Sequence, residues 1–226
     1  IMTGDVDFAQ FHSVSMLVDD TMPPMLETLQ SVDKTFRERP HLNSQATTAY
    51  VNAKNFSVEF LTPNRGSDGN AGEPAKMPAL GGASAQALRY LDFLIRKPVQ
   101  AVLLHKGGVA VTVPASERYA VHKLIVSTLR KDDPNGAAKA RKDAQQAGHL
   151  IEALTLNSSK ADLGLIWMEA WDRGQRWQEN LAAGRKRLNS EQANLLRAAA
   201  KEACEHENKA LNAYGFKEQH EDKRKA

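Results

Sequence analysis

The N-terminal half of the chain combines short apolar segments with frequent turn residues, a pattern typical of a β-sheet. In residues 55–61, Phe56, Val58 and Phe60 alternate with polar side chains, so successive side chains point to opposite faces of a strand. Further strands are predicted over residues 6–11, 13–18, 47–54, 99–104 and 109–113. The last two flank a Lys-Gly-Gly turn, which favours a hairpin. Helices are predicted over residues 23–31 and 84–96, and a loop over residues 64–82.

From residue 115 onward the pattern becomes almost wholly helical. Helices are predicted over residues 115–130, 137–156, 160–188 and 190–214. A Pro-Asn-Gly-containing break at residues 132–136 separates the first two, and Gly174 or Gly184 is expected to interrupt the third. Ser190 is the expected N-cap of the last helix. The predicted fold class is therefore α+β, with a mixed sheet of about five strands followed by a helical C-terminal region.

Composition adds only broad limits to this picture. The 226 residues are 42% hydrophobic, enough for one sizeable core or for a small catalytic domain with a helical annex. A net charge of +3 permits a nucleic-acid partner without requiring one. Cys204 is the only cysteine, so no disulfide can form within the chain, as is usual in a reducing cytoplasm. With no apolar run long enough to span a bilayer and no signal-peptide pattern at the start, we expect a cytoplasmic location without membrane partners.

Two carboxylates near the start of the chain are candidates for metal binding. Asp5 and Asp7 are two residues apart in a predicted strand, so both point to the same face. Side by side they repel each other unless a cation lies between them, and Mg²⁺ is a natural occupant because it prefers oxygen ligands. The alternative is a solvated strand face, since this spacing is common and by itself favours no metal.

Glu59 is the candidate third carboxylate. Its neighbours Val58 and Phe60 are expected to face the core, which turns Glu59 to the other side of its strand. Two acids on one strand and a third on a neighbouring strand match a two-metal phosphoryl-transfer site. Taken alone, this strand also fits an ordinary solvent-facing glutamate.

Four stretches of the sequence together resemble a known enzyme superfamily. They are TGDVDF at residues 3–8, VEFLTP at 58–63, PASERYAVHKLIVS at 114–127 and KARKDAQQAGHLIEAL at 139–154. In this order they resemble the polymerase-β-like nucleotidyltransferases, and more closely a bacterial nucleotidyltransferase family related to abortive-infection toxin enzymes. The resemblance covers roughly residues 3 to 155. It implies a catalytic core over residues 1–114, ahead of a helical domain over residues 115–226.

The resemblance also implies roles for the three acids. Asp5, Asp7 and Glu59 match the catalytic acids that bind the divalent ions, Mg²⁺ or Mn²⁺. The family usually has Asp at the third place, so Glu59 is one methylene longer than the pattern. These enzymes also carry a Gly-Ser or Gly-Thr turn upstream of the paired acids. We expect that turn in a segment that precedes residue 1 in the natural protein.

Three residues of the helical half are candidates for nucleotide binding by the same resemblance. Lys123 would contact the triphosphate from a helix face that it shares with Ser127 and Arg130, while Lys142 and Asp143 would line the cleft. The alternatives are a solvated helix face for Lys123 and an exposed ion pair between Asp143 and Lys139, on the same helix.

Trp167 and Trp171, four residues apart, are candidates for stacking bases. The interpretation that we favour places them in the core of the helical half or at an interface.

The function implied is transfer of a nucleoside monophosphate from an NTP to an acceptor hydroxyl of RNA (such as a tRNA), a protein or a small molecule. The toxin-like relatives add a cognate antitoxin as a candidate partner. Two alternatives stay open. One is a catalytically degenerate relative that acts as a nucleotide- or RNA-binding interaction module, because the glycine turn is not in the sequence and Glu59 replaces Asp. The other makes residues 157–226 a docking region for protein or RNA.

Overall fold

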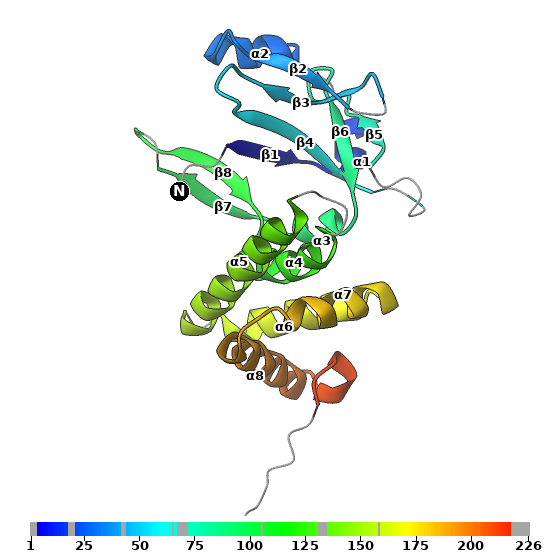
Figure 1. Cartoon of the computed structure of the whole chain (residues 1–226), viewed down its shortest axis with the longest axis vertical. Coiled ribbons are helices and arrows are strands. Elements are labelled where there is room, and N and C mark those ends of the chain that lie inside the picture. The colour runs from blue at the N-terminus through cyan, green and yellow to red at the C-terminus, as the bar shows by residue number, and fades with distance from the viewer. Residues whose placement is uncertain are drawn as a thin grey trace, which may run out of the picture. The chain divides into compact units, whose positions relative to one another are not determined.

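The computed structural model describes residues 4–17, 21–41, 44–64, 66, 72–104, 106–130, 135–157 and 159–217. The chain divides into two compact units, Ile1–Arg96 and Lys97–Ala226. The first unit carries a mixed β-sheet with short helices, and the second carries a β-hairpin and the long helices (Figure 1). These elements confirm the predicted α+β class. The hairpin, which was predicted to belong to the catalytic core, lies in the second unit.

The sheet of the first unit is built around β4 (Ser57–Pro63). On the path through the sheet, the strands follow the order β2 (Arg37–Pro40), β3 (Thr47–Val51), β4, β6 (Ser84–Leu88) and β5 (Pro74–Lys76). A further strand, β1 (Asp5–Ala9), also pairs with β4. The β3 strand is antiparallel to β4, whereas β1 and β6 run parallel to it, so this sheet is mixed as predicted.

One face of this sheet packs into the core of the unit. Val58 and Phe60 of β4 are each 3% exposed and join a buried cluster with Tyr50 from β3 and Met77. Helix α2 (Met25–Val32), predicted from the paired prolines, contributes Met25 to the same cluster. Burial therefore follows the period-two alternation from Val58 to Thr62. The strand predicted over residues 55–61 is confirmed, with both ends two residues later in the chain.

Two predictions for this unit are wrong. Residues 84–96 form β6 and the one-turn helix α3 (Leu91–Leu94) instead of one helix, because β6 pairs with β4 on one side and β5 on the other. Tyr90, in the left-handed region at φ 66°, separates the two elements. The described part of residues 13–18 belongs to helix α1 (His12–Leu17) instead of a strand. The buried Ser15 hydroxyl of α1 accepts a hydrogen bond from the backbone N–H of Ala79 at 3.0 Å, a contact that local pattern cannot reveal.

Two further strands were not predicted. The β5 strand lies inside the segment expected to be a loop, and β2 consists of Arg-Glu-Arg-Pro, which has no apolar alternation. All four residues of β2 are exposed. Its pairing with the longer β3 defines it as a strand, since nothing in its own composition does.

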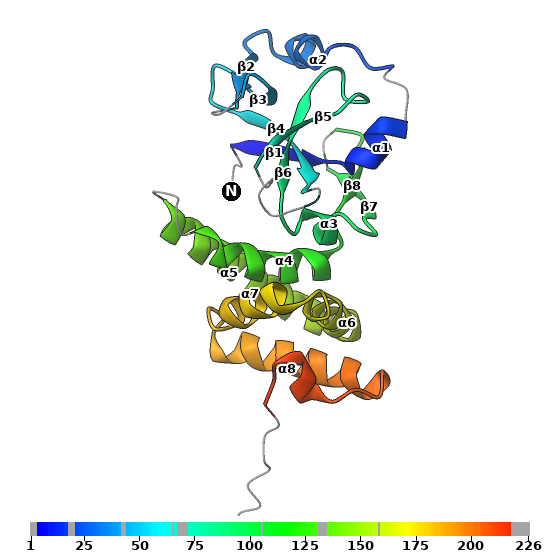
Figure 2. The same cartoon turned by 90° about the vertical axis from the view of Figure 1, so that its right-hand side faces the viewer.

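The second unit begins with the predicted hairpin and continues as helices. The hairpin pairs β7 (Val99–Leu103) with β8 (Val109–Val113). The helices are α4 (Ser116–Thr128), α5 (Gly136–Leu156), α6 (Lys160–Trp171), α7 (Gln175–Arg185) and α8 (Ser190–His206), followed by a 3₁₀ turn at Leu211–Tyr214. Figures 1 and 2 show them in layers, with α4 beside α5, then α6 and α7, then α8. The described helices include none that is long and apolar enough to cross a lipid bilayer.

The helix ends agree with the sequence in part. Gly174, at φ 110°, separates α6 from α7, whereas Gly184 lies inside α7. The predicted cap of α8 is wrong by one residue. The N-cap is Asn189, whose side chain accepts a hydrogen bond from the backbone N–H of Gln192, and the Gln192 side chain completes a capping box. Of the break predicted over residues 132–136, residues 132–134 lie outside the described residues, and α5 begins at Gly136.

Trp167 belongs to the core of the helical unit. Its side chain is fully buried, its indole N–H donates to the Tyr214 carbonyl at 3.1 Å, and its ring stacks on Trp171 at 5.9 Å between centroids. A buried ring cannot receive a nucleic-acid base, so for Trp167 the interpretation as core is confirmed.

Candidate active site

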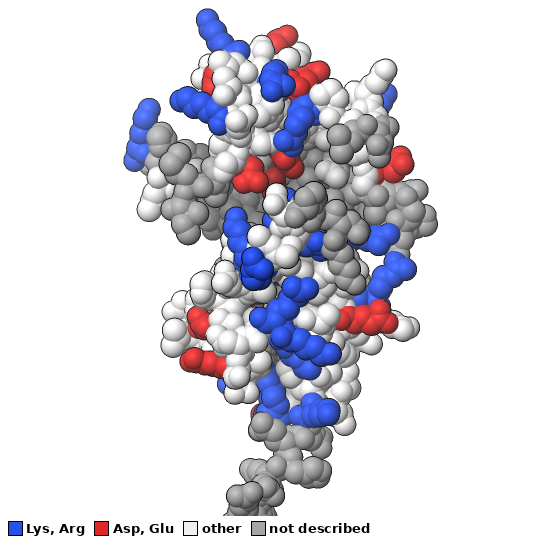
Figure 3. Space-filling view, viewed as in Figure 1, with Lys and Arg blue, Asp and Glu red and all other residues white. Residues whose placement is uncertain are grey.

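The register between β1 and β4 brings the predicted acids next to each other. The two strands are parallel, with Asp5 opposite Ser57 and Asp7 opposite Glu59. Residues that pair across neighbouring strands project to the same side of a sheet. Asp5 and Asp7, two residues apart, share that side with Glu59. Acidic side chains gather over β1 and β4 in the space-filling view (Figure 3).

This acidic side is the face of the sheet opposite the core cluster. Phe8, next to Asp7, stacks on the buried Phe60 at 5.8 Å between ring centroids. Because side chains alternate along each strand, Asp7 and Glu59 point away from that aromatic contact. The exposed carboxylates of β1 therefore stand on an accessible surface, where a solvated ligand can reach them.

The backbone spacing of this acidic face fits divalent metal ions. Neighbouring strands lie about 4.8 Å apart, and residues two apart on a strand are separated by about 6.6 Å. Mg²⁺ takes oxygen ligands at about 2.1 Å and accepts one or two carboxylates, with phosphate and water completing its coordination. Side chains of aspartate and glutamate can close these gaps by rotation about their own bonds. Asp5, Asp7 and Glu59 therefore have the chemistry and the backbone placement to hold one or two ions.

The Glu59 side chain is turned to other partners. Its Oε1 accepts a hydrogen bond from Nη2 of Arg39 at 2.5 Å and a second one from the Ser57 hydroxyl at 3.2 Å. Within the described residues, no three His, Cys, Asp or Glu side chains come together as a ready metal cluster. Metal binding would thus require Glu59 to rotate from Arg39 towards the carboxylates of β1.

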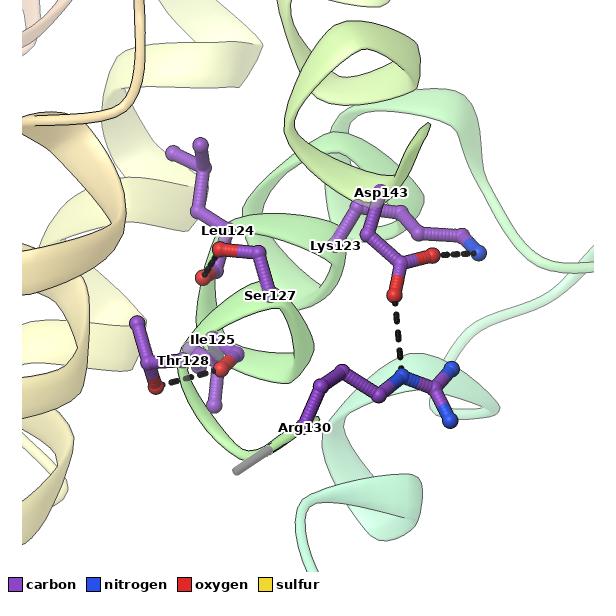
Figure 4. A network of polar contacts seen from close by, with 7 residues as sticks. All are labelled: Lys123, Leu124, Ile125, Ser127, Thr128, Arg130 and Asp143. Atoms are coloured by element: carbon purple, nitrogen blue, oxygen red, sulfur yellow. Dashed lines mark hydrogen bonds and ion pairs between the residues drawn. The ribbon is translucent and has the colours of Figure 1, made fainter. Parts of the chain in front are cut away.

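The helical unit holds a second group of predicted residues, and Figure 4 shows how they lie. The Asp143 carboxylate of α5 is nearly buried, at 5% exposure of its side chain. Its Oδ1 accepts from Nζ of Lys123 at 2.7 Å and its Oδ2 from Nε of Arg130 at 3.2 Å. Both cations come from the α4 side, so Asp143 ties the two helices together. The burial of this carboxylate differs from the exposed ion pair that the alternative with Lys139 assumed.

The remaining predicted members of this group lie apart from the ion pairs. The buried Ser127 hydroxyl donates a hydrogen bond to the Leu124 carbonyl of its own helix at 2.7 Å (Figure 4). Lys142 precedes Asp143 on α5, about 100° away around the helix, and is exposed. The structure therefore brings together Lys123 and Asp143 but leaves Lys142 outside their network.

A comparison with protein-family models gives a match over residues 1–172, to a family described as nucleotidyltransferase. This chain belongs to that nucleotidyltransferase family. The matched region includes the acidic face of the first unit and the α4–α5 ion pairs of the second. No curated protein and no solved structure matches the chain.

Two contacts of this nucleotidyltransferase were missed by reasoning from the sequence. Arg39 and Ser57 both hold the Glu59 carboxylate, but neither was predicted as a site residue. Ser57 could have been found, because it lies two residues before Glu59 and so shares its face. Arg39 could not, because its strand was not recognised as one.

Proposed function

We propose that this nucleotidyltransferase transfers a nucleoside monophosphate from an NTP to an acceptor hydroxyl, with Asp5, Asp7 and Glu59 as metal-binding catalytic residues. The observation that carries the proposal is the parallel register that sets Asp7 beside Glu59 and leaves Asp5 on the same face. Two bound Mg²⁺ or Mn²⁺ ions would lower the pKa of the attacking hydroxyl and neutralise charge on the leaving pyrophosphate. The three carboxylates would fix where those ions lie.

The residues of the helical unit take supporting roles in this proposal. Lys123, held in place by Asp143, is suited to contact phosphate oxygens as a point charge. Lys142, exposed on α5, would add a second phosphate contact. Asp143 acts through Lys123, since its two carboxylate oxygens are already bonded to cations.

The experiment is a labelling reaction with each of the four NTPs, carrying the label on the α-phosphate, and total cellular RNA and protein as acceptors. The proposal predicts label on one acceptor class and release of one pyrophosphate per labelled acceptor. Asp7→Asn should abolish both. Glu73→Gln, which changes an exposed acid elsewhere in the same unit, should leave them intact. Label that persists at the wild-type level in Asp7→Asn would overturn the assignment.

A second candidate function is favoured by one specific contact. Glu59 is longer than the aspartate that its family usually carries, and it is paired with Arg39. A catalytically degenerate relative that binds nucleotide or RNA without transferring it would retain such a pair permanently. In the same experiment it would bind an NTP but release no pyrophosphate and label no acceptor.

A further inference from the structure

Arg39 stands in line with the acids of the proposed site. The β2–β3 register pairs Arg39 with Ala49, and the β3–β4 register pairs Ala49 with Glu59. The β1–β4 register continues the row to Asp7. One line of paired residues across four strands therefore reads Arg39, Ala49, Glu59, Asp7, with all four side chains on the same face.

The small residue in this row lets the arginine reach the acid. Arg39 and Glu59 are separated by two strand spacings, about 10 Å between backbones. Ala49 lies between them with only a methyl group and is buried, so the long stem of Arg39 can cross over it. A larger side chain at this position would stand in the path of the guanidinium.

The Arg39–Glu59 pair is open to exchange. The Arg39 side chain is 49% exposed and that of Glu59 30% exposed, with 2.5 Å between Nη2 and Oε1. Exposed pairs of this kind contribute little to stability, because water competes for both charges. A divalent ion carries twice the charge of the guanidinium, so it can displace Arg39 from the carboxylate. The ion pair thus positions Glu59 but is weak enough for a metal ion to displace it.

We propose that Arg39 exchanges partners when the site is loaded: it holds Glu59 in the metal-free protein and binds the triphosphate once Glu59 turns to the metal. This inference rests on the proposed function and adds a residue to it. Arginine suits the second role because its planar guanidinium can donate two parallel hydrogen bonds to phosphate oxygens, which lysine cannot. Arg39 is therefore a positioning residue for Glu59 and a phosphate ligand in turn.

The exchange makes metal binding and triphosphate binding depend on Arg39 in opposite directions. For the metal alone, Arg39 is a competitor for Glu59, so its removal should strengthen binding. For the triphosphate, Arg39 is a ligand, so its removal should weaken binding. A residue that only supports the sheet would change both affinities in the same direction or change neither. Tighter metal binding together with weaker triphosphate binding is therefore diagnostic of the exchange.

The test is isothermal titration calorimetry with Mn²⁺ alone, and then with a nonhydrolysable nucleoside triphosphate at saturating Mn²⁺. The wild type is compared with Arg39→Gln, Arg39→Lys and the control Arg37→Gln, which removes an exposed arginine from the same face of β2, two residues away. We expect Arg39→Gln to bind Mn²⁺ roughly fivefold tighter and the triphosphate roughly tenfold weaker, within the usual range of coupling between sites. Arg39→Lys should lie between it and the wild type for the triphosphate. Arg37→Gln should change neither affinity more than about twofold.

Each other outcome overturns the exchange. Parallel losses of both affinities in Arg39→Gln and Arg39→Lys would show that Arg39 has a structural role. Unchanged affinities would show that Arg39 has no role in binding either ligand. If the wild type binds no Mn²⁺, the proposed function fails and the exchange fails with it. If the wild type binds both ligands but Arg39→Gln does not change the two affinities in opposite directions, only the exchange fails. Circular dichroism of each variant shows whether the fold is retained, and Arg39→Lys keeps the test decisive if Arg39→Gln does not fold.

Discussion

Removing the Asp143 carboxylate should destabilise the helical unit by an amount that its geometry allows us to work out. Asp143→Ala breaks two charge-assisted hydrogen bonds, at 2.7 Å to Lys123 and 3.2 Å to Arg130. Hydrogen bonds to charged groups are each worth about 1.5–3 kcal/mol. The side chain of Lys123 is 17% exposed and that of Arg130 36%, so water recovers part of the loss, most of it at Arg130. We expect a net loss of about 2–4 kcal/mol in the free energy of unfolding.

The assay is urea unfolding followed by tryptophan fluorescence, to which the buried Trp167 of the same unit contributes. A double-mutant cycle of Asp143→Ala with Lys123→Met should give a coupling energy of about 1–3 kcal/mol. The matched control is Lys142→Ala, an exposed neighbour on α5, which should cost less than about 0.5 kcal/mol. A loss at Asp143 as small as the control, or a coupling energy near zero, would refute the reasoning that this carboxylate ties α4 to α5.

Three further predictions concern packing, proton binding and capping. A Cβ on Gly164 of α6 would overlap the Ala199 carbonyl oxygen of α8. Thermal unfolding of Gly164→Ala should therefore show a loss of about 1–3 kcal/mol in the free energy of unfolding. A variant as stable as the wild type would contradict this close approach. Burial, helped by Glu38, raises the pKa of Tyr50 from its ordinary 10.0 to about 12. The folded state therefore keeps a proton that the unfolded state loses, and stability should fall between about pH 10 and 12. Urea unfolding should show a smaller fall in Tyr50→Phe, and equal falls would disprove the link. Asn189→Ala removes the N-cap of α8 and should lower the free energy of unfolding by about 1 kcal/mol in urea unfolding. An unchanged free energy would show that the capping box is dispensable.

Local patterns were enough to predict the elements whose ends are marked by their own residues. The β7–β8 hairpin follows from its Lys-Gly-Gly turn, and the break between α6 and α7 follows from Gly174, whose φ of 110° suits glycine. The strand β4 follows from alternation, because its core face is buried whereas Glu59 and Leu61 on the other face are half-buried. In each case the signal lies within a few residues of the element that it defines.

The elements that could not be predicted owe their conformation to distant partners. Leu88, Leu91 and Ile95 have the apolar spacing of a helix, but residues 84–88 form a strand because β4 and β5 pair with them. Helix α1 likewise depends on a hydrogen bond between Ser15 and the chain at Ala79. Sequence neighbours carry no information about such contacts.

The same division applies to the candidate site. Alternation along single strands was enough to expect Asp5 and Asp7 on one face, and to turn Glu59 away from Val58. The register that sets Asp7 beside Glu59 is a property of two strands far apart along the chain, and the sequence does not contain it. The partners of Asp143 could not be predicted from the sequence for a related reason. They come from the α4 side, whereas spacing along α5 pointed to a partner on the same helix.

The most direct measurement is a crystal structure of the protein with Mn²⁺ and a nonhydrolysable nucleoside triphosphate, using the anomalous signal of the metal. The account predicts anomalous density about 2.1 Å from carboxylate oxygens of Asp5, Asp7 and Glu59, with the triphosphate on the same ions. It also predicts that Arg39 has left Glu59 for a phosphate oxygen. Mn²⁺ and triphosphate bound elsewhere, with Glu59 still paired to Arg39, would contradict the central claim that these three acids form the catalytic metal site.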